Sequence, residues 1–314
     1  MSEIDSVFFK KAMKIVIFGM GGVGGLVGGL LARSHNDTYF YARGENLRVI
    51  KEQGLTVESA QFGTFNVRPK LVTDNASEIG VADVVFIACK GYDLNEVCKT
   101  AEPMIGANTV VIPLLNGVIV SEIMEPLLPA CILADGCIFT FCNLVKPGFI
   151  SHQNFVRIII GMRSGELLPV LEEIVEILNE SGITSKVSDD ILRDSWKKYT
   201  IMCGNSTIFG WFDAEAGVVK KTPEYETVIR AIWGELVAVA AAKGVILPEN
   251  TVDDCVNSFE LMPPETVTSL YRDLRDKKPV ERTELDHIIG RMVRLGEETG
   301  VAVPYHKAAL EKFQ

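Results

Sequence analysis

The chain has 314 residues, of which 47% are hydrophobic, and a formal net charge of −10. This length is sufficient for about two domains with cores of their own. The negative charge disfavours nucleic acids and acidic membrane surfaces as general partners, because their phosphates would be repelled. Apolar stretches are too short or too often interrupted by charges to predict a membrane span.

The cysteines and the first twelve residues bear on the cellular compartment of the protein. Seven cysteines are scattered without a C-x-x-C pair or a neighbouring histidine pair, which predicts reduced thiols, no metal site and a cytoplasmic location. Residues 1–12 lack the apolar core and cleavage site of a signal peptide, so we interpret them as an N-terminal extension.

A glycine-rich motif directly follows the first strand-like run, residues 15–18. It reads Gly19-Met20-Gly21-Gly22-Val23-Gly24 and leads into a small, apolar stretch typical of a helix. Gly19 would let the chain reverse, Gly21 would let the backbone approach a pyrophosphate, and Gly24 would let the helix pack on the sheet. With a second strand at residues 38–41, the motif predicts a dinucleotide-binding βαβ unit.

The end of the second predicted strand bears on the choice between NAD and NADP. An NAD site normally has Asp or Glu there, which accepts hydrogen bonds from the ribose, whereas this chain has Arg43. A guanidinium group suits a 2′-phosphate. The sequence therefore favours NADP, and Glu45 leaves NAD open.

Strands and helices alternate through the first half, and long helices follow. The predicted strands are residues 54–58, 65–68, 83–89, 109–115, 132–141, 155–160 and 184–187, the first two as an antiparallel pair. The predicted helices are residues 46–53, 170–180, 190–209, 224–243, 264–276 and 283–299. We therefore predict an α/β fold, with an N-terminal Rossmann-type parallel-sheet domain at residues 13–186 that binds NADP and a C-terminal all-helical substrate and catalytic domain at residues 187–314. Ligands would bind between them, at the carboxyl ends of the strands.

Four polar residues occupy positions suited to such a cleft. Lys90 and Asn116 each follow a predicted central strand, Lys198 lies on a largely apolar helix, and Glu284 begins the last predicted helix. Each also has a simpler structural interpretation: a turn former, a lysine at the edge of a core helix, or an acid that favours a helix dipole.

These elements together resemble the ketopantoate reductase family over nearly the whole chain. The resemblance rests on the glycine motif and five further segments in order: Cys89-Lys90-Gly91, Leu115-Asn116-Gly117-Val118, Pro147-Gly148-Phe149-Ile150-Ser151-His152, Trp196-Lys197-Lys198 and Thr283-Glu284-Leu285-Asp286. It implies NADPH-dependent reduction of 2-dehydropantoate to (R)-pantoate, a step toward pantothenate and coenzyme A.

The resemblance also assigns roles to single residues. Lys198 matches the catalytic lysine, which would act as general acid, and Glu284 matches an active-site glutamate that would also lie by the cofactor. Asn116 matches an asparagine that contacts cofactor and substrate, Lys90 a cofactor-side lysine, and Arg43 the arginine that reads the 2′-phosphate. A metal is not needed, because the ammonium group serves as the electrophile.

The chain differs from the family pattern at residues that are expected to lie near the substrate. Met202 and Ser206 stand where the family has asparagines on the helix of the catalytic lysine, and Asn205 lies near enough to substitute. Ser269 is the candidate partner of a substrate carboxylate, and Glu281 is a lesser candidate for the acidic role. These changes affect the identity of the 2-keto acid more than the reaction type.

Three alternatives stay open at this point. A β-hydroxyacid dehydrogenase also combines a dinucleotide domain, helices and a lysine, but its serine- and glycine-rich substrate loop is not evident. A noncatalytic nucleotide sensor would be expected to have lost Lys198 and Glu284, and both are present. A methyltransferase would have an acid in place of Arg43.

A homodimer is compatible with the sequence, which does not fix the oligomeric state.

Overall fold

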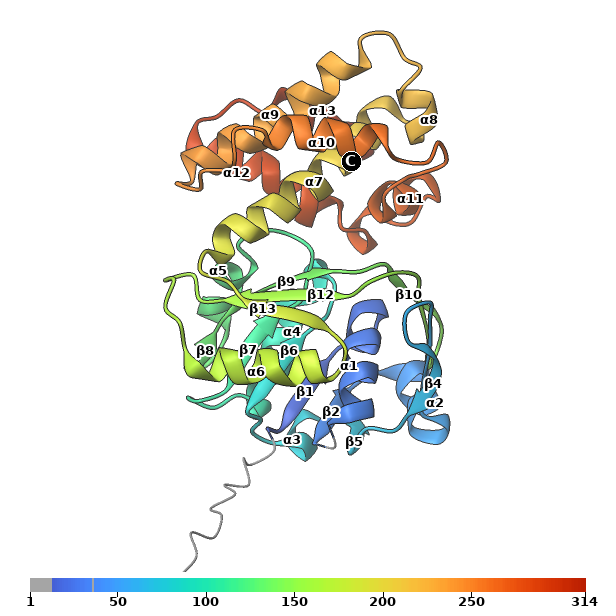
Figure 1. Ribbon diagram of the computed structural model, residues 1–314, viewed down its shortest axis with the longest axis vertical. Coiled ribbons are helices and arrows are strands. Elements are labelled where there is room, and N and C mark those ends of the chain that lie inside the picture. Colours follow the sequence, from blue (N-terminus) through green and yellow to red (C-terminus); the bar gives the residue numbers. More distant parts are fainter. Residues whose placement is uncertain (1–12, 36) are drawn as a thin grey trace, which may run out of the picture.

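The computed structural model describes residues 13–35 and 37–314, so the predicted extension at residues 1–12 lies outside the described residues. The strands gather in one half of the molecule and most of the later helices in the other (Figure 1). Helix α7 (Ile191–Phe212) runs from the first half into the second.

A six-stranded parallel sheet forms the centre of the first half. Its strand order is β5-β2-β1-β6-β7-β8. Every neighbouring pair is parallel. The strands are β1 (Ile15–Phe18), β2 (Thr38–Tyr41), β5 (Leu71–Thr73), β6 (Val84–Ile87), β7 (Val110–Pro113) and β8 (Ile132–Leu133). This arrangement confirms the predicted Rossmann-type sheet.

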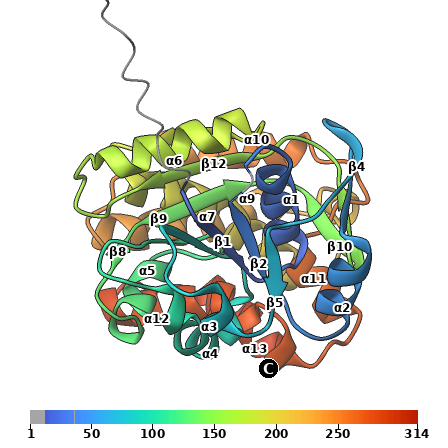
Figure 2. The ribbon, with the colours of Figure 1, turned by 90° about the horizontal axis from the view of Figure 1, so that it is seen from below.

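Helices cover both faces of the sheet, which is why the central strands are continuous apolar runs. Ile15 and Ile17 of β1 belong to a core shared with α1 and α6, whereas Val16 and Phe18 belong to a core shared with α3, α4 and α5. Figure 2 shows these two helical layers on opposite sides of the strands. The helices of this half are α1 (Gly22–Ser34), α2 (Gly44–Gln53), α3 (Ala76–Ile79), α4 (Leu94–Ala101), α5 (Val120–Met124) and α6 (Pro169–Glu180).

Two smaller sheets complete this half. One has the order β10-β11-β3-β4 and the other β13-β12-β9. Their strands are β3 (Leu55–Ser59), β4 (Gly63–Val67), β9 (Asp135–Phe139), β10 (Cys142–Lys146), β11 (Phe149–His152), β12 (Arg157–Gly161) and β13 (Thr184–Val187). The predicted antiparallel pair, β3 and β4, is confirmed. The single strand predicted at residues 132–141 is wrong, because β8 ends the large sheet and β9 joins a different one.

The second half is helical and has its own core. Its helices are α7, α8 (Ala216–Val219), α9 (Tyr225–Ala242), α10 (Thr251–Glu260), α11 (Ser269–Arg275), α12 (Arg291–Thr299) and α13 (Pro304–Phe313). Trp196, Tyr199 and Trp233 are among its largest fully buried side chains. Within the described residues, no helix is both long enough and apolar enough to cross a bilayer.

The helical predictions need two corrections. The helix predicted at residues 264–276 begins only at Ser269, where the Thr268 side chain accepts a hydrogen bond from the N–H of Tyr271 and caps the helix. The single helix predicted at residues 283–299 is instead a π-helical segment (Asp286–Gly290) followed by α12, with a short 3₁₀ turn (Val280–Arg282) before it.

Candidate functional site

The glycine motif forms a tight turn between β1 and α1. Gly19 has a φ of +98°, and a Cβ there would lie 2.7 Å from the carbonyl oxygen of Ala88. A Cβ on Gly24 would lie 1.8 Å from Gly19 O, so the helix begins too close to the turn for any side chain. Gly21 faces open space instead. Of the two larger residues in the motif, Met20 is buried and Val23 is partly buried.

The start of α1 is free to meet an anion. Its N-cap, Gly21, offers no side-chain cap, and the first turn carries no acidic residue. The first backbone N–H groups of a helix have no partner within the helix and carry partial positive charge. The turn therefore fits a dinucleotide pyrophosphate, and residues 19 to 24 are those that would hold it.

Arg43 lies beside this turn, at the end of β2. The N–H of Gly19 donates to the carbonyl of Tyr41 at 3.1 Å, which joins the two strand ends. Arg43 Nη1 makes an ion pair of 2.7 Å with Glu96 Oε1. Both side chains are more than half exposed, 52% and 65%, so water screens the ion pair. Arg43 can therefore readily exchange Glu96 for another anion.

The structure brings four of the predicted site residues together across the two halves. Lys90 follows β6, and its Nζ lies 2.6 Å from Glu284 Oε2. Asn116 follows β7, and its Oδ1 accepts a hydrogen bond of 3.3 Å from Lys198 Nζ on α7. The Glu284 side chain is only 7% exposed, whereas that of Lys90 is 50% exposed. Two strand ends, helix α7 and the bend that carries Glu284 thus meet at one place.

The environment of Lys198 adjusts its proton affinity. Burial lowers the pKa of the Lys198 ammonium, and the nearby Cys137 and Glu284 oppose this effect. The ring of Phe139, at the end of β9, has its centroid 5.8 Å from Lys198 Nζ. The ammonium therefore lies between an acid, an amide and an aromatic ring.

His287 was not predicted to belong to the site. Its Nε2 lies 2.6 Å from the backbone oxygen of Asn116, and burial lowers its pKa. A signal for it was available in the sequence, because His287 lies three residues after Glu284 and therefore on the same face of the helix predicted at residues 283–299. No comparable signal pointed to Phe139.

The predicted substrate residues lie further along α7 and at the start of α11. Asn205 is buried, and its Oδ1 has no hydrogen-bond partner among the described residues. Ser206 Oγ lies 3.4 Å from Thr268 Oγ1, the residue before the exposed Ser269. Met202 is partly buried and packs against the helical core. Among the described residues, no hydrogen bond joins Asn205 or Ser269 to Lys198, which lies about two helical turns before Asn205.

Glu281, the lesser candidate for the acidic role, lies on the 3₁₀ turn and is exposed. Within the described residues, no hydrogen bond or ion pair joins it to Lys198, whereas Glu284 lies close enough to affect the pKa of that lysine. Glu284 is therefore the better placed of the two acids.

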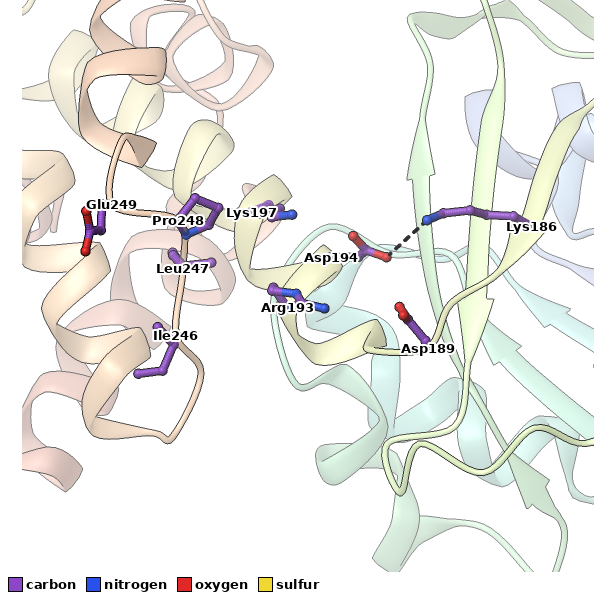
Figure 3. A pocket seen from close by; sticks show the side chains of 9 residues that line it. All are labelled: Lys186, Asp189, Arg193, Asp194, Lys197, Ile246, Leu247, Pro248 and Glu249. Atoms are coloured by element: carbon purple, nitrogen blue, oxygen red, sulfur yellow. Dashed lines mark ion pairs between the residues drawn. The ribbon is translucent and has the colours of Figure 1, made fainter.

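A separate pocket of about 460 Å³ opens near the start of α7 (Figure 3). Its lining residues are Lys186, Asp189, Arg193, Asp194, Lys197, Ile246, Leu247, Pro248 and Glu249. Three cations and three acids balance each other, and Lys186 pairs with Asp194 at 3.9 Å. This pocket shares no residue with the predicted site.

The parallel sheet, the glycine turn and the helical second half define a Rossmann-type α/β protein with a second, helical body. Comparison with known families gives the particular family. Residues 15–165 match the model "Ketopantoate reductase PanE/ApbA", and residues 190–314 match its C-terminal counterpart. The chain belongs to the ketopantoate reductase family and is an oxidoreductase of that family.

Individual relatives span nearly the whole chain. An uncharacterized oxidoreductase, YkpB of Bacillus subtilis, is 28% identical over 96% of this chain and 98% of its own. A 2-dehydropantoate 2-reductase of Archaeoglobus fulgidus is 29% identical over 96% of each. A PanE/ApbA family ketopantoate reductase structure from Ralstonia eutropha superposes with a TM-score of 0.83 at 26% identity, covering 95% and 96% of the two chains.

A D-mandelate dehydrogenase shares the same fold. Its structure, solved with NADH and anilino(oxo)acetate, has a TM-score of 0.83 to this chain at 24% identity and covers 96% and 97% of the two chains. The same architecture therefore occurs in a protein named for a different hydroxy acid.

Proposed function

We propose that this protein reduces a 2-keto acid to the corresponding 2-hydroxy acid with NADPH, and that 2-dehydropantoate is the first substrate to test. The observation that carries the proposal is the meeting of Lys90, Asn116, Lys198 and Glu284 at the ends of β6 and β7. In parallel α/β sheets, this edge is where ligands bind. The product (R)-pantoate would feed pantothenate and coenzyme A synthesis, and the seven free thiols suit a cytoplasmic setting.

The two halves divide the work in this proposal. Residues 13–186 would hold NADPH, with residues 19 to 24 at the pyrophosphate and Arg43 at the 2′-phosphate, once Arg43 exchanges Glu96 for that anion. Residues 187–314 would supply Lys198 and Glu284. Bound NADPH supplies a hydride from the nicotinamide ring to the keto carbon.

The chain's own residues supply the proton and the orientation. The Lys198 ammonium donates a hydrogen bond to the keto oxygen and transfers its proton from Nζ as negative charge develops there. Asn116 Oδ1 holds the ammonium from the cofactor side. Glu284 favours the protonated lysine through its charge and fixes Lys90 beside the cofactor.

Two apolar side chains near Lys198 bear on which keto acid the site would accept. Met202 replaces an asparagine of the family pattern, and a thioether accepts a hydrogen bond only weakly and cannot donate one. Phe139 adds an aromatic ring near Lys198. These two apolar groups favour a keto acid with a larger apolar side chain as the alternative to 2-dehydropantoate. Asn205 and Ser269 are the candidate polar contacts of either substrate.

The test is a panel of 2-keto acids assayed for oxidation of NADPH and of NADH. The panel includes 2-dehydropantoate, pyruvate, a branched aliphatic keto acid and phenylglyoxylate. We expect turnover of at least one member, and faster with NADPH. Tight NADPH binding without turnover of any member would support a nucleotide sensor instead. Oxidation of 3-hydroxy acids, measured as reduction of NADP⁺ or NAD⁺, without turnover of any panel member would support a β-hydroxyacid dehydrogenase.

A further inference from the structure

We propose that His287 is a positioning residue of this site, which holds Asn116 in the orientation from which its side chain contacts Lys198. The inference rests on the proposed function, because Lys198 is the proton donor there. His287 belongs to the π-helical segment Asp286–Gly290, and such segments often occur at functional sites.

One hydrogen bond fixes the form of the imidazole ring. His287 Nε2 lies 2.6 Å from the backbone oxygen of Asn116. A carbonyl oxygen only accepts hydrogen bonds, so Nε2 carries the proton and donates. Burial lowers the pKa of His287, which keeps the ring neutral with Nδ1 unprotonated.

The ring also fits between two loops that lack side chains where they face it. A Cβ on Gly91 would lie 2.3 Å from His287 Cγ, and a Cβ on Gly117 would lie 2.7 Å from His287 Nε2. Gly91 directly follows Lys90, and Gly117 directly follows Asn116. One imidazole therefore packs against both strand-end loops that carry candidate residues.

A closed set of contacts then connects His287 to Lys198. Tyr199, the neighbour of Lys198 on α7, donates from its hydroxyl to the carbonyl of Ile288 at 2.6 Å. Ile288 is the neighbour of His287. Asn116 accepts from His287 through its backbone and from Lys198 through its side chain. The contact between Tyr199 and Ile288 fixes the two helical segments, and the bond from His287 then fixes Asn116 relative to both.

Loss of His287 should change the orientation of Asn116 without unfolding the helical core. Tyr199 is fully buried in the helical core, whereas His287 is only partly buried at the edge of that core. Loss of the His287 donor should leave α7 in place and free Asn116 to turn away from Lys198. Misplacement of an orienting group lowers the rate of the chemical step more than the affinity for ligands.

The first experiment compares His287→Phe, which keeps a ring without a donor, with His287→Gln, whose amide can donate in place of Nε2. With the best 2-keto acid, we expect kcat to fall about tenfold in His287→Phe, with the Kd of NADPH changed less than about threefold, and to recover to within about threefold in His287→Gln. His35→Phe is the matched control, because His35 Nε2 bonds the backbone oxygen of Met13 far from the site. An unchanged kcat in His287→Phe, or equal losses in both variants with a lowered Tm, would overturn the proposal.

The second experiment uses the fit between His287 and Gly91. Gly91→Ala should lower kcat when His287 is present and have little further effect in His287→Ala, because the added methyl group then has room. If the losses of kcat in Gly91→Ala and His287→Ala instead add up in the double variant, the two residues do not pack against each other as proposed.

A third measurement does not require turnover, so it separates failure of this inference from failure of the proposed function. In ¹H–¹⁵N spectra of the histidine rings at neutral pH, His287 should appear as the Nε2–H tautomer, assigned by its loss in His287→Phe. The Nδ1–H tautomer would refute the bond to Asn116 even in a protein with no activity on the panel.

Discussion

Asn116 Oδ1 accepts a hydrogen bond of 3.3 Å from Lys198 Nζ, although the two residues lie 82 positions apart in the chain. The bond joins the carboxyl end of β7 to helix α7. It therefore connects the half of the molecule that carries the glycine turn to the half that carries the lysine. In the proposed reaction, Lys198 and the glycine turn act on one substrate from different halves of the molecule. A contact such as this one is needed to fix the position of one half relative to the other.

Arg43 is expected to determine the preference for NADPH. Arg43→Ala should raise the Kd of NADPH about tenfold or more and leave the Kd of NADH nearly unchanged, because only NADPH carries the 2′-phosphate. Fluorescence titration of both cofactors measures this difference. Arg48→Ala is the control, since Arg48 lies on α2, the helix that follows Arg43, and pairs with Glu45 and Glu52. Equal weakening of both cofactors by Arg43→Ala would exclude the assignment.

The activity should decline at alkaline pH as Lys198 loses its proton. Burial lowers the pKa of Lys198, so the decline is expected to begin below its ordinary value of 10.5. Glu284→Gln removes a charge that opposes this lowering, so its alkaline limb should move to lower pH.

The profile of log(kcat/KM) between pH 6 and 10 shows the position of this limb. Glu281→Gln serves as the control, because Glu281 is exposed on the 3₁₀ turn, and it should leave the limb in place. An upward movement of the limb in Glu284→Gln, or none, would show that this carboxylate does not act on the lysine.

Met202 should influence which keto acid is accepted. Met202→Asn restores a hydrogen-bonding amide one turn after Lys198, so we expect kcat/KM for 2-dehydropantoate to rise relative to that for phenylglyoxylate, by about tenfold. Ile201→Asn is the control, because Ile201 is a more exposed neighbour on the same helix. If the ratio of the two substrates stays constant in Met202→Asn, then Met202 does not line the substrate site.

The stability of the helical half should depend on His306 and Glu235. His306 is fully buried, its Nδ1 lies 2.5 Å from Glu235 Oε2, and that carboxylate also accepts from the N–H of Tyr305 at the start of α13. Burial lowers the pKa of His306 below 6.5, although Glu235 partly opposes this. The unfolded chain therefore binds a proton at a pH where the folded protein does not, and the folded state loses stability as the pH falls below about 6.5.

Urea unfolding at several pH values between 5 and 7.5 measures this effect. The free energy of unfolding of the unaltered protein should decrease toward acid pH. In His306→Gln it should be lower at pH 7.5 and decrease less steeply, by up to about 1.4 kcal/mol per pH unit. An equal slope in the two proteins would mean that His306 does not titrate in this range.

Most of the sheet could be predicted from the sequence, because its strands are continuous apolar runs between glycine and polar turns. For residues 283–299 the sequence predicted a helix but not its π-helical first turn, since residue periodicity does not distinguish a π-helical turn from an α-helix. Lys90, Asn116, Lys198 and Glu284 could be proposed singly from strand ends and motifs. Their mutual contacts and the role of His287 depend on how two helical segments pack across the strand ends, and local sequence patterns do not specify that packing.

The most direct test of the central claim is kcat for 2-dehydropantoate and NADPH in Lys198→Ala beside the unaltered protein. Loss of a general acid should lower kcat about 10²-fold or more, with NADPH affinity retained. Lys197→Ala, the neighbouring lysine at the separate pocket, should keep full activity. An active enzyme whose kcat is unchanged in Lys198→Ala would contradict the account.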